Sequence, residues 1–587
     1  MVKPVIFVLG ISALPLAQKL KAELNGKIHT PDCVNGGDIS YAKATAHLAE
    51  LFQQGHTIIG LCASGILIRA IAPHLNDKRT EPPVIAVAED GSSIVPLLGG
   101  HHGANELAQK IADITKGHAA ITTAGDLRFG IALDKPPVEY ALANHADIKS
   151  FTSRLLAGDS VHIQGNAPWL QSLRQSDDAE LKITVTDLDI PGSATELIYH
   201  PCTLAVGVGC ERGTTYEEVS KLIEDTLASH GLSDISVSCY ASIDLKEDEP
   251  AIYGLEYTRI RYFSADELKA ESHRLKNPSD YVLAEVGTPS VAEAAALAAA
   301  GPDAELIVPK TKSKRATVAV ARAPSPIVEL RGRMRGNLSI VGIGPGSNRT
   351  RSPRATSELR LATDWVGYGL YLDLVADLKQ DQTEHRFPLG GEENRVRHAI
   401  ELAKQGKQVA LVCSGDAGIY AMAALVYEII DLEPNRISVE VIPGISAFQA
   451  AAAKAGAMIG HDFCCISLSD LLTPWEAIEK RVKAAAEGDF VISFYNPRSL
   501  KRRDQLERAF AILKAHRPPD TPVIIASNLG RAEENVRIVT FADFNPDDVD
   551  MLTLVMVGSS QSKSFARGDG RTYAYTPRGY AKKRETQ

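Results

Sequence analysis

The chain has 587 residues, of which 44% are hydrophobic and 23% are charged, and its formal net charge is -9. A chain this long exceeds the size at which one hydrophobic core stops growing, so we expect about three to five domains. The mildly acidic balance disfavours a nucleic-acid-binding protein.

Cysteine usage and hydropathy indicate the compartment. Eight cysteines are scattered along the chain without a C-x-x-C pair, which disfavours a zinc site and predicts no bound metal. So few cysteines in a long chain are typical of the reducing cytoplasm. No apolar run reaches the ~18 residues of a membrane span. The initial "VIFVL" leads directly into a helical pattern, which favours a buried strand over a signal peptide.

The pattern of residues 1–145 predicts an α/β domain. Short apolar runs such as "PVIFVLG", "TIIGLCA" and "PPVIAVAED" alternate with helical stretches such as "YAKATAHLAELFQQG". This alternation predicts a parallel sheet covered by helices. Residues 146–200 form a smaller mixed segment.

Residues 201–325 begin a new α/β block, in which a strand, a glycine turn and an amphipathic helix follow one another. The block ends in "ELIVPKTKSKRATVAVARA", which predicts a β-hairpin with a basic tip. The prolines and arginines of "PSPIVELRGRMRG" then mark a linker over residues 326–336, most simply a solvated connector.

The last block, residues 337–587, opens with the glycine-rich stretch "SIVGIGPG". Gly342 and Gly344 match a dinucleotide fingerprint, but the third glycine position holds Ser347. Pro345 also removes a backbone N–H that a phosphate site would use. Two interpretations stay open from this stretch alone: a ligand without phosphate that the backbone approaches closely, or a tight turn between strand and helix.

Four further strand-and-turn segments follow this loop. Since ligands of open α/β sheets bind beyond the carboxyl ends of strands, five such turns in order indicate one binding cleft. The segments are "QVALVCSGDAGIYAMAALVYEI", "ISVEVIPGISAFQAAAAKAGA", "DFVISFYNPRS" and "VIIASNLGRAEENVRI".

On these segments, together with "VGYGLYLDL", the second half resembles the tetrapyrrole (corrin/porphyrin) methyltransferases, and most closely those that methylate precorrin-3B at C-17 in cobalamin biosynthesis. The resemblance implies two subdomains, about 337–450 and 451–575, with S-adenosylmethionine in the cleft between them, and a homodimer. One departure is "NRTRSPRA", where the family often has Leu-Thr after the proline loop. The implied cofactor-binding residues are Gly344, Pro345, Gly346, Gly415, Asp416, Ala417, Gly418, Ile419, Ser446, Ala447, Leu468 and Asn496.

Methyl transfer to a carbon of an electron-rich macrocycle is mainly a matter of position and orientation. A base is a further candidate requirement, to take a hydroxyl proton during ring contraction. Asp416 is the candidate because it lies at a cleft turn, but an aspartate that caps the turn is an equally good interpretation.

The first half resembles the cobalt-precorrin-5A hydrolases through "GLCASGILIRAIAPHLNDKRTEPPVIAVAEDGSSIVPLLGGHHGANELA", "ITTAGD", "AVGVGCERGTTYEEV" and "VPKTKSKRATVAVAR". The resemblance implies opening of a δ-lactone on the macrocycle and loss of acetaldehyde. His101 is a candidate general base or cobalt contact, or a local helix cap. The stretch "GGHHGAN" departs from the usual Ser-Gly-His-x-Gly-Gly-Ala-Asn, so a non-catalytic corrinoid-binding module is the alternative.

Glu211, Arg212, Lys310 and Lys312 are candidate contacts to the substrate, because a corrinoid carries many carboxylates that cationic groups attract. Pairing with neighbours, or a solvated hairpin tip, explains them equally well. A nicotinamide-dependent oxidoreductase is disfavoured by Pro345 and Ser347. We therefore expect an α/β protein throughout that is cytoplasmic, takes a corrinoid substrate, and binds neither nucleic acid nor membrane.

Overall fold

The computed structural model describes residues 4–77, 80–122, 132–255, 259–499 and 503–580, and the side chain of His101 lies outside this description. The chain divides into two compact units. The first comprises Met1–Ala241, Lys269–Leu283 and Thr288–Arg331, and the second comprises Ser242–Leu268, Ala284–Gly287 and Gly332–Gln587. Each is built from β-sheets and packed helices.

The first domain is a seven-stranded sheet in the order β3-β2-β1-β4-β5-β6-β7. All four residues of β1 are buried, since its side chains point alternately into cores on the two faces of the sheet. Helices α1 and α4 contribute to one core, and α2 and α3 to the other. The elements are β1 (Val5–Val8), α1 (Leu14–Leu24), β2 (Lys27–Pro31), β3 (Ile39–Tyr41), α2 (Ala44–Gln53), β4 (Ile58–Leu61), α3 (Ser64–Ile71), β5 (Val84–Val87), β6 (Ser93–Leu98), α4 (Ala104–Thr115) and β7 (His118–Ala119).

The expectation of a purely parallel sheet is wrong at β6, which pairs antiparallel with β5. Only a short turn joins these two strands, and Ala88 N–H donates to the Ser93 carbonyl across it at 2.9 Å. A parallel neighbour needs a crossover of a dozen or more residues, so this connection imposes the antiparallel direction.

A second, four-stranded sheet follows in the order β8-β11-β10-β9. Its first strand, β8, precedes residue 146, where the sequence predicts that this segment begins. It nevertheless belongs to this sheet, because it pairs antiparallel with β11. The elements are β8 (Tyr140–Leu142), α6 (Ile148–Ala157), β9 (Val161–Gln164), β10 (Leu181–Val185) and β11 (Glu196–Pro201).

The third sheet has the order β14-β13-β12-β16-β15. The predicted hairpin is confirmed, since β15 and β16 pair antiparallel. The elements are β12 (Leu204–Cys210), α7 (Tyr216–Ser229), β13 (Val237–Ile243), α8 (Pro250–Tyr253), β14 (Ile260–Phe263), α9 (Ala265–Ala270), α10 (Asp280–Val286), α11 (Ala292–Ala300), β15 (Glu305–Lys312) and β16 (Ala316–Arg322).

Within the second unit, the arginine-rich segment is anchored at Arg333. Its amide donates to the Tyr262 carbonyl at 3.0 Å and its carbonyl accepts from the Tyr262 amide at 2.8 Å. Its guanidinium lies 3.0 Å from the carboxylates of both Asp244 and Glu247. The solvated connector that composition predicts is therefore wrong at this residue.

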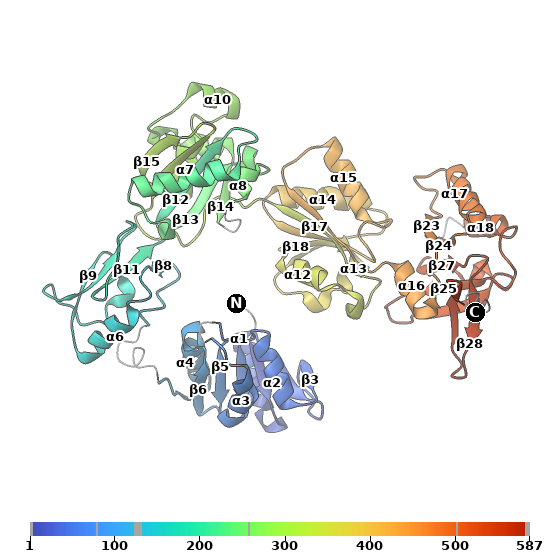
Figure 1. Ribbon diagram of the computed structural model, residues 1–587, viewed down its shortest axis with the longest axis horizontal. Helices are drawn as coiled ribbons and strands as arrows, with labels where there is room; N and C mark the ends of the chain where they lie inside the picture. Colours follow the sequence, from blue (N-terminus) through green and yellow to red (C-terminus); the bar gives the residue numbers. More distant parts are fainter. Residues whose placement is uncertain (1–3, 78–79, 123–131, 256–258, 500–502, 581–587) are drawn as a thin grey trace. The chain divides into compact units, whose positions relative to one another are not determined.

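The sheet that begins at residue 337 has the order β19-β18-β20-β17-β21, and all its neighbouring strands are parallel. Helices α14 and α15 contribute to the core on one face, and α12 and α13 to the core on the other (Figure 1). All five strands therefore end at one edge. The elements are β17 (Asn337–Gly342), α12 (Pro353–Leu361), β18 (Asp364–Tyr368), α13 (Gly369–Asp373), β19 (Thr383–Phe387), α14 (Glu392–Lys404), β20 (Gln408–Cys413), α15 (Met422–Leu432) and β21 (Ser438–Ile442).

The last large sheet is mixed, with the order β23-β24-β27-β25-β26. Strands β24 and β25 both pair antiparallel with β27, so they run in the same direction and end at one edge, where β27 begins. The elements are β23 (Phe463–Ser467), α17 (Trp475–Glu487), β24 (Val491–Tyr495), α18 (Gln505–Leu513), β25 (Pro522–Ser527), β26 (Asn535–Thr540) and β27 (Thr553–Val557).

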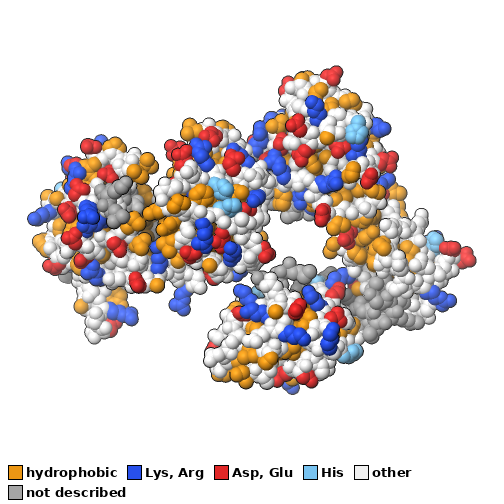
Figure 2. Space-filling view, turned by 180° about the vertical axis from the view of Figure 1, so that it is seen from behind, with side chains coloured by type: hydrophobic (Ala, Val, Ile, Leu, Met, Phe, Trp, Pro, Cys, Tyr) orange, Lys and Arg blue, Asp and Glu red, His pale blue; other side chains and the backbone are white. Residues whose placement is uncertain are grey.

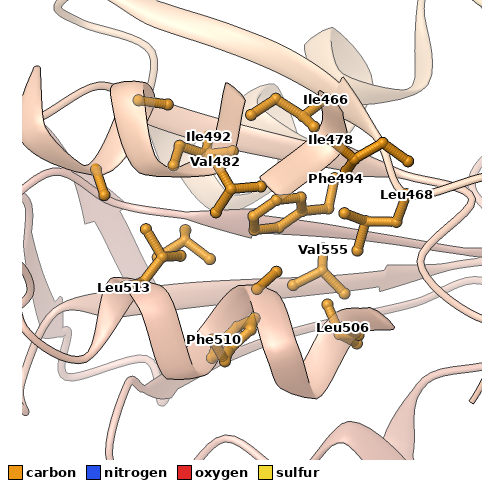
Figure 3. Close-up of a cluster of buried hydrophobic side chains, with 14 of the residues drawn as sticks. Ile466, Leu468, Ile478, Val482, Ile492, Phe494, Leu506, Phe510, Leu513 and Val555 are labelled. Carbon is orange, nitrogen blue, oxygen red and sulfur yellow. The ribbon is translucent and has the colours of Figure 1, made fainter. Parts of the chain in front are cut away.

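The core of this sheet is an apolar cluster in which Phe494 of β24 lies between side chains of α17 and α18 (Figure 3). The opposite face packs against α16 (Ala447–Ala455), whose small side chains bring the helix close to Ile524 and Met556. Helix α16 therefore belongs to the core of this second subdomain. A three-stranded sheet completes it, with β22 (Gly456–Ala457), β28 (Lys563–Ala566) and β29 (Thr572–Tyr575) in the order β22-β29-β28.

Lysine and arginine side chains are interspersed with aspartate and glutamate on the face seen in Figure 2. None of the helices in the described part of the chain combines the length and the apolar character that crossing a bilayer requires.

Candidate functional site

The glycine turns after β17, β20 and β21 pack against one another. Gly344 N–H donates to the Gly415 carbonyl at 3.1 Å, and Gly415 N–H donates back to the Gly344 carbonyl at 2.8 Å. A Cβ on Gly444 would lie 2.1 Å from the Gly415 carbonyl oxygen and 2.7 Å from that of Gly342. These glycines are required because three loops meet there with no room for side chains.

Gly346 makes room for a side chain from the other subdomain. A Cβ at this position would lie 2.5 Å from Cγ of Arg531. Arg531 donates from Nε to the Pro345 carbonyl at 3.2 Å and from Nη2 to Ser414 Oγ at 3.3 Å. The loop that carries the proline is thus tied to the turn after β25.

These loops border a cavity of about 350 Å³, within the range of small-molecule sites. Seven of the twelve predicted cofactor residues line it: Pro345, Gly415, Asp416, Ile419, Ser446, Ala447 and Asn496. Five others lie outside the lining: Gly344, Gly346, Ala417, Gly418 and Leu468. Leu468 is fully buried in the core of the second subdomain, so its side chain packs there.

Sequence reasoning missed much of the lining. Tyr495 and Asn528 belong to segments already quoted, so the rule of strand ends points to them. The segment 551–554 does not follow the end of a strand; it lies where β27 begins, at the edge where β24 and β25 end. The other missed residues are Tyr368, Tyr371, Leu389, Glu392, Arg395, Val412, Cys413, Ser414, Tyr420, Ala421, Met422, Ala526, Leu529 and Arg531.

Three non-glycine residues of the lining have left-handed backbone conformations. Their φ angles are 51° at Tyr420, 49° at Asn496 and 51° at Asn528. Such conformations are unfavourable for side chains with a Cβ and gather at ligand sites. Their concentration here independently indicates a functional cavity.

Two tyrosines form an aromatic wall of the cavity. The ring centroids of Tyr420 and Tyr495 lie 5.2 Å apart, and the Tyr420 hydroxyl donates to the Cys465 carbonyl at 2.8 Å. Burial raises the pKa of both hydroxyls above the ordinary tyrosine value, so both stay neutral at physiological pH.

The carboxylate of Asp416 accepts two backbone hydrogen bonds. Gly418 N–H donates to Oδ1 at 2.8 Å and Gly444 N–H donates to Oδ2 at 3.1 Å. These bonds hold the turn after β20 against the turn after β21. The geometry supports the turn-capping interpretation, while a role as base stays a prediction.

The start of α16 lines the cavity, and two of its backbone N–H groups already donate to acceptors within the protein. The Ser446 amide donates to Oε1 of Gln449 at 3.0 Å, and the Phe448 amide donates to the Tyr495 hydroxyl at 3.3 Å. Ala447 is the first residue of the helix, so its amide has no acceptor within the helix. It is a candidate donor to a bound ligand.

The candidates of the first half are paired with their neighbours. The Glu211 carboxylate lies 3.2 Å from the Arg315 guanidinium, which also donates to the Arg212 carbonyl. Lys310 Nζ donates to the Asn277 carbonyl at 2.8 Å, and burial lowers its pKa.

The other two candidates of the first half are Lys312 and His101. Lys312 is exposed at the end of β15. His101 lies in the short helix Gly100–His102, with its side chain outside the described atoms.

The second half thus consists of two α/β subdomains with a cavity of small-molecule size at their strand ends, an arrangement typical of a ligand-binding enzyme. The family described as Tetrapyrrole (Corrin/Porphyrin) Methylases matches residues 337–545, and the chain belongs to this family. Its members depend on S-adenosylmethionine in general. The first half matches Cobalamin synthesis G N-terminal over residues 46–126 and Cobalamin synthesis G C-terminus over residues 204–321. Both predicted resemblances are confirmed.

Individual relatives match the second half. A "Probable cobalt-factor III C(17)-methyltransferase" of Salmonella typhimurium is 46% identical over 41% of this chain and 99% of its own length. A "Precorrin-3B C(17)-methyltransferase" of Sinorhizobium sp is 39% identical over 42% of this chain and 98% of its own. The crystal structure of the methyltransferase CobJ is 38% identical, covers 41% of this chain and 100% of that one, and has a TM-score of 0.39. The chain spans about half of longer relatives, 49% of one and 46% of another.

Proposed function

We propose that this chain is a two-part enzyme of cobalamin biosynthesis. Residues 337–587 transfer a methyl group from S-adenosylmethionine to C-17 of precorrin-3B, or of its cobalt-containing counterpart, with contraction of the ring. The observation that carries this proposal is the 46% identity to a C(17)-methyltransferase over 99% of that relative.

The cavity suits the cofactor in size and chemistry. Its lining combines the aromatic pair Tyr420 and Tyr495 with polar backbone at the start of α16. When bound, S-adenosylmethionine supplies an electrophilic methyl group. The tyrosines would pack against the adenine, the Ala447 amide would donate to a polar atom, and Pro345 would narrow the cavity. Such fixed contacts lower the barrier by orienting the two reactants.

A thermal-shift experiment tests the cofactor. A saturating excess of S-adenosylhomocysteine, at about 100 times its Kd, should stabilise the chain by about 2.7 kcal/mol, and NADH should not. Stabilisation by NADH alone would refute the proposal. Parallel assays with precorrin-3B and its cobalt complex identify the acceptor, because relatives of both names match this chain.

We propose that the first half opens the lactone of cobalt-precorrin-5A and releases acetaldehyde. Its support is the match of both Cobalamin synthesis G domains, at residues 46–126 and 204–321. Incubation of the full chain with cobalt-precorrin-5A should release acetaldehyde. Binding of the corrinoid without acetaldehyde would favour the non-catalytic module instead.

The remaining expectations of assembly and location belong to the same proposal. The chain works in the cytoplasm as a homodimer formed through its methyltransferase half. Light scattering on the purified chain measures its mass in solution, and a mass equal to the 63.1 kDa of one chain would contradict the dimer.

A further inference from the structure

Arg395 of α14 is a buried cation at the wall of the cavity. The residue is 3% exposed, and its Nη2 donates to the Pro388 carbonyl at 3.0 Å. Its Nε is buried with no hydrogen-bond partner, and Nη1 contacts only the Met422 sulfur, at 4.0 Å. Among the residues that the structure describes, no carboxylate forms an ion pair with it.

Arg531 is a second cation of the same lining. It is held by the Pro345 carbonyl and Ser414 Oγ, and no ion pair to it occurs in the described parts of the chain. Both arginines lie near Tyr371, which also lines the cavity: burial raises the pKa of its hydroxyl, and the positive charges of Arg531 and Arg395 oppose that rise. Two guanidinium groups therefore act on one region of the cavity.

The acidic side chains of the lining do not neutralise these arginines. The Glu392 carboxylate accepts a hydrogen bond from the Gly390 amide at 3.2 Å, and the Asp416 carboxylate accepts from two backbone amides. A buried guanidinium without a charge partner is unfavourable, and a carboxylate that accepts forked hydrogen bonds compensates for this best.

We propose that Arg395 and Arg531 form an anion-binding end of the cavity that takes a carboxylate of a bound ligand. This inference rests on the proposed function, which supplies two sources of that group: the amino-acid end of S-adenosylmethionine and a side-chain carboxylate of the tetrapyrrole. In either case the arginines position the ligand and take no part in bond making.

The experiment compares Arg395→Gln and Arg531→Gln with Arg397→Gln in the full chain. Arg397 is a matched control because it lies on the same helix, has 42% of its side chain exposed, and pairs with Glu393 and Glu433. Calorimetry measures binding of S-adenosylhomocysteine and of its decarboxylated analogue, and steady-state kinetics give KM for the tetrapyrrole. Arg395→Lys keeps the charge without the fork, and melting temperatures identify variants that do not fold.

If the carboxylate belongs to the cofactor, both glutamine variants bind S-adenosylhomocysteine about 10- to 100-fold more weakly, and the decarboxylated analogue binds all variants alike. If it belongs to the tetrapyrrole, cofactor binding is unchanged and KM rises by a similar factor. Unchanged binding and KM in folded variants overturn the inference. Failure of the wild-type chain to bind S-adenosylhomocysteine counts instead against the proposed function.

Discussion

At the scale of single residues, a substitution at Asp416 distinguishes a structural role of its carboxylate from a role as catalytic base. Both carboxylate oxygens accept backbone hydrogen bonds, from Gly418 and Gly444. In Asp416→Asn the new side-chain NH2 group, itself a donor, faces one of these backbone N–H donors. We therefore expect a loss of about 1–3 kcal/mol in stability and weaker binding of S-adenosylhomocysteine. Chemical denaturation and calorimetry measure both. A large fall in kcat with unchanged stability and binding would instead make Asp416 a base.

His29 gives a prediction about pH in the first domain. Burial, then the charges of His47, His56 and Lys27, lower the pKa of His29 to about 4, with Asp38 opposing; its Nδ1 lies 2.8 Å from His47 Nε2. The unfolded histidine binds a proton below about pH 6.5, whereas the folded one does so only near pH 4. The stability contribution is therefore complete above pH 6.5 and is lost as the pH falls towards 4.

Hydrogen exchange of the amides in β2 and α2 measures this loss, which we expect to be on the order of 2–3 kcal/mol. His29→Gln should flatten the pH dependence, because glutamine does not titrate. His118→Gln, at an exposed position of the same domain, is the control. An unchanged pH profile in His29→Gln would contradict the assignment.

At the scale of elements, the meeting of three loops gives a steric prediction. In Gly444→Ala the new methyl group lies 2.1 Å from the Gly415 carbonyl oxygen and 2.7 Å from that of Gly342, and these backbone atoms cannot move aside without shifting a strand. We expect a loss of at least about 1–3 kcal/mol and weaker cofactor binding. In Gly568→Ala no atom lies within 4 Å of the new methyl group, so this control should behave like the wild type. Equal melting temperatures would contradict the packing argument.

Only part of the cavity lining could be predicted from the sequence, because the rule of strand ends needs only local pattern and order. That rule points to the turns that carry Gly415, Asp416 and Ser446, and the family resemblance adds Pro345 and Asn496. It fails where sheet direction matters: the segment 551–554 lines the cavity because β27 runs against its neighbours, which no local pattern records.

Other failures have the same kind of cause. Gly346 lies outside the lining because its space belongs to Arg531, nearly two hundred positions away in the chain. The antiparallel β6 in the first domain follows from the short connection after β5, which the apolar pattern alone does not reveal. In each case tertiary contacts decide what local periodicity leaves open.

At the scale of the whole molecule, the methyltransferase half lies within one compact unit, and most of the first half, apart from Ser242–Leu268 and Ala284–Gly287, lies in the other. Units with their own cores tolerate local damage in one another. Gly444→Ala should therefore lower methyl transfer and leave acetaldehyde release from cobalt-precorrin-5A within about twofold of the wild type. Product assays on one preparation measure both. A parallel fall of the two rates would show that the halves depend on each other.

The contact between Gly346 and Arg531 has a consequence for engineering. A chimera that exchanges one methyltransferase subdomain with a relative must match the residue at 346 with the residue at 531. A larger side chain at 346 displaces the arginine, and a smaller one at 531 leaves a hole over the glycine. Subdomain exchange should therefore succeed only when the incoming subdomain carries the residue that fits the one it meets, glycine at 346 or arginine at 531.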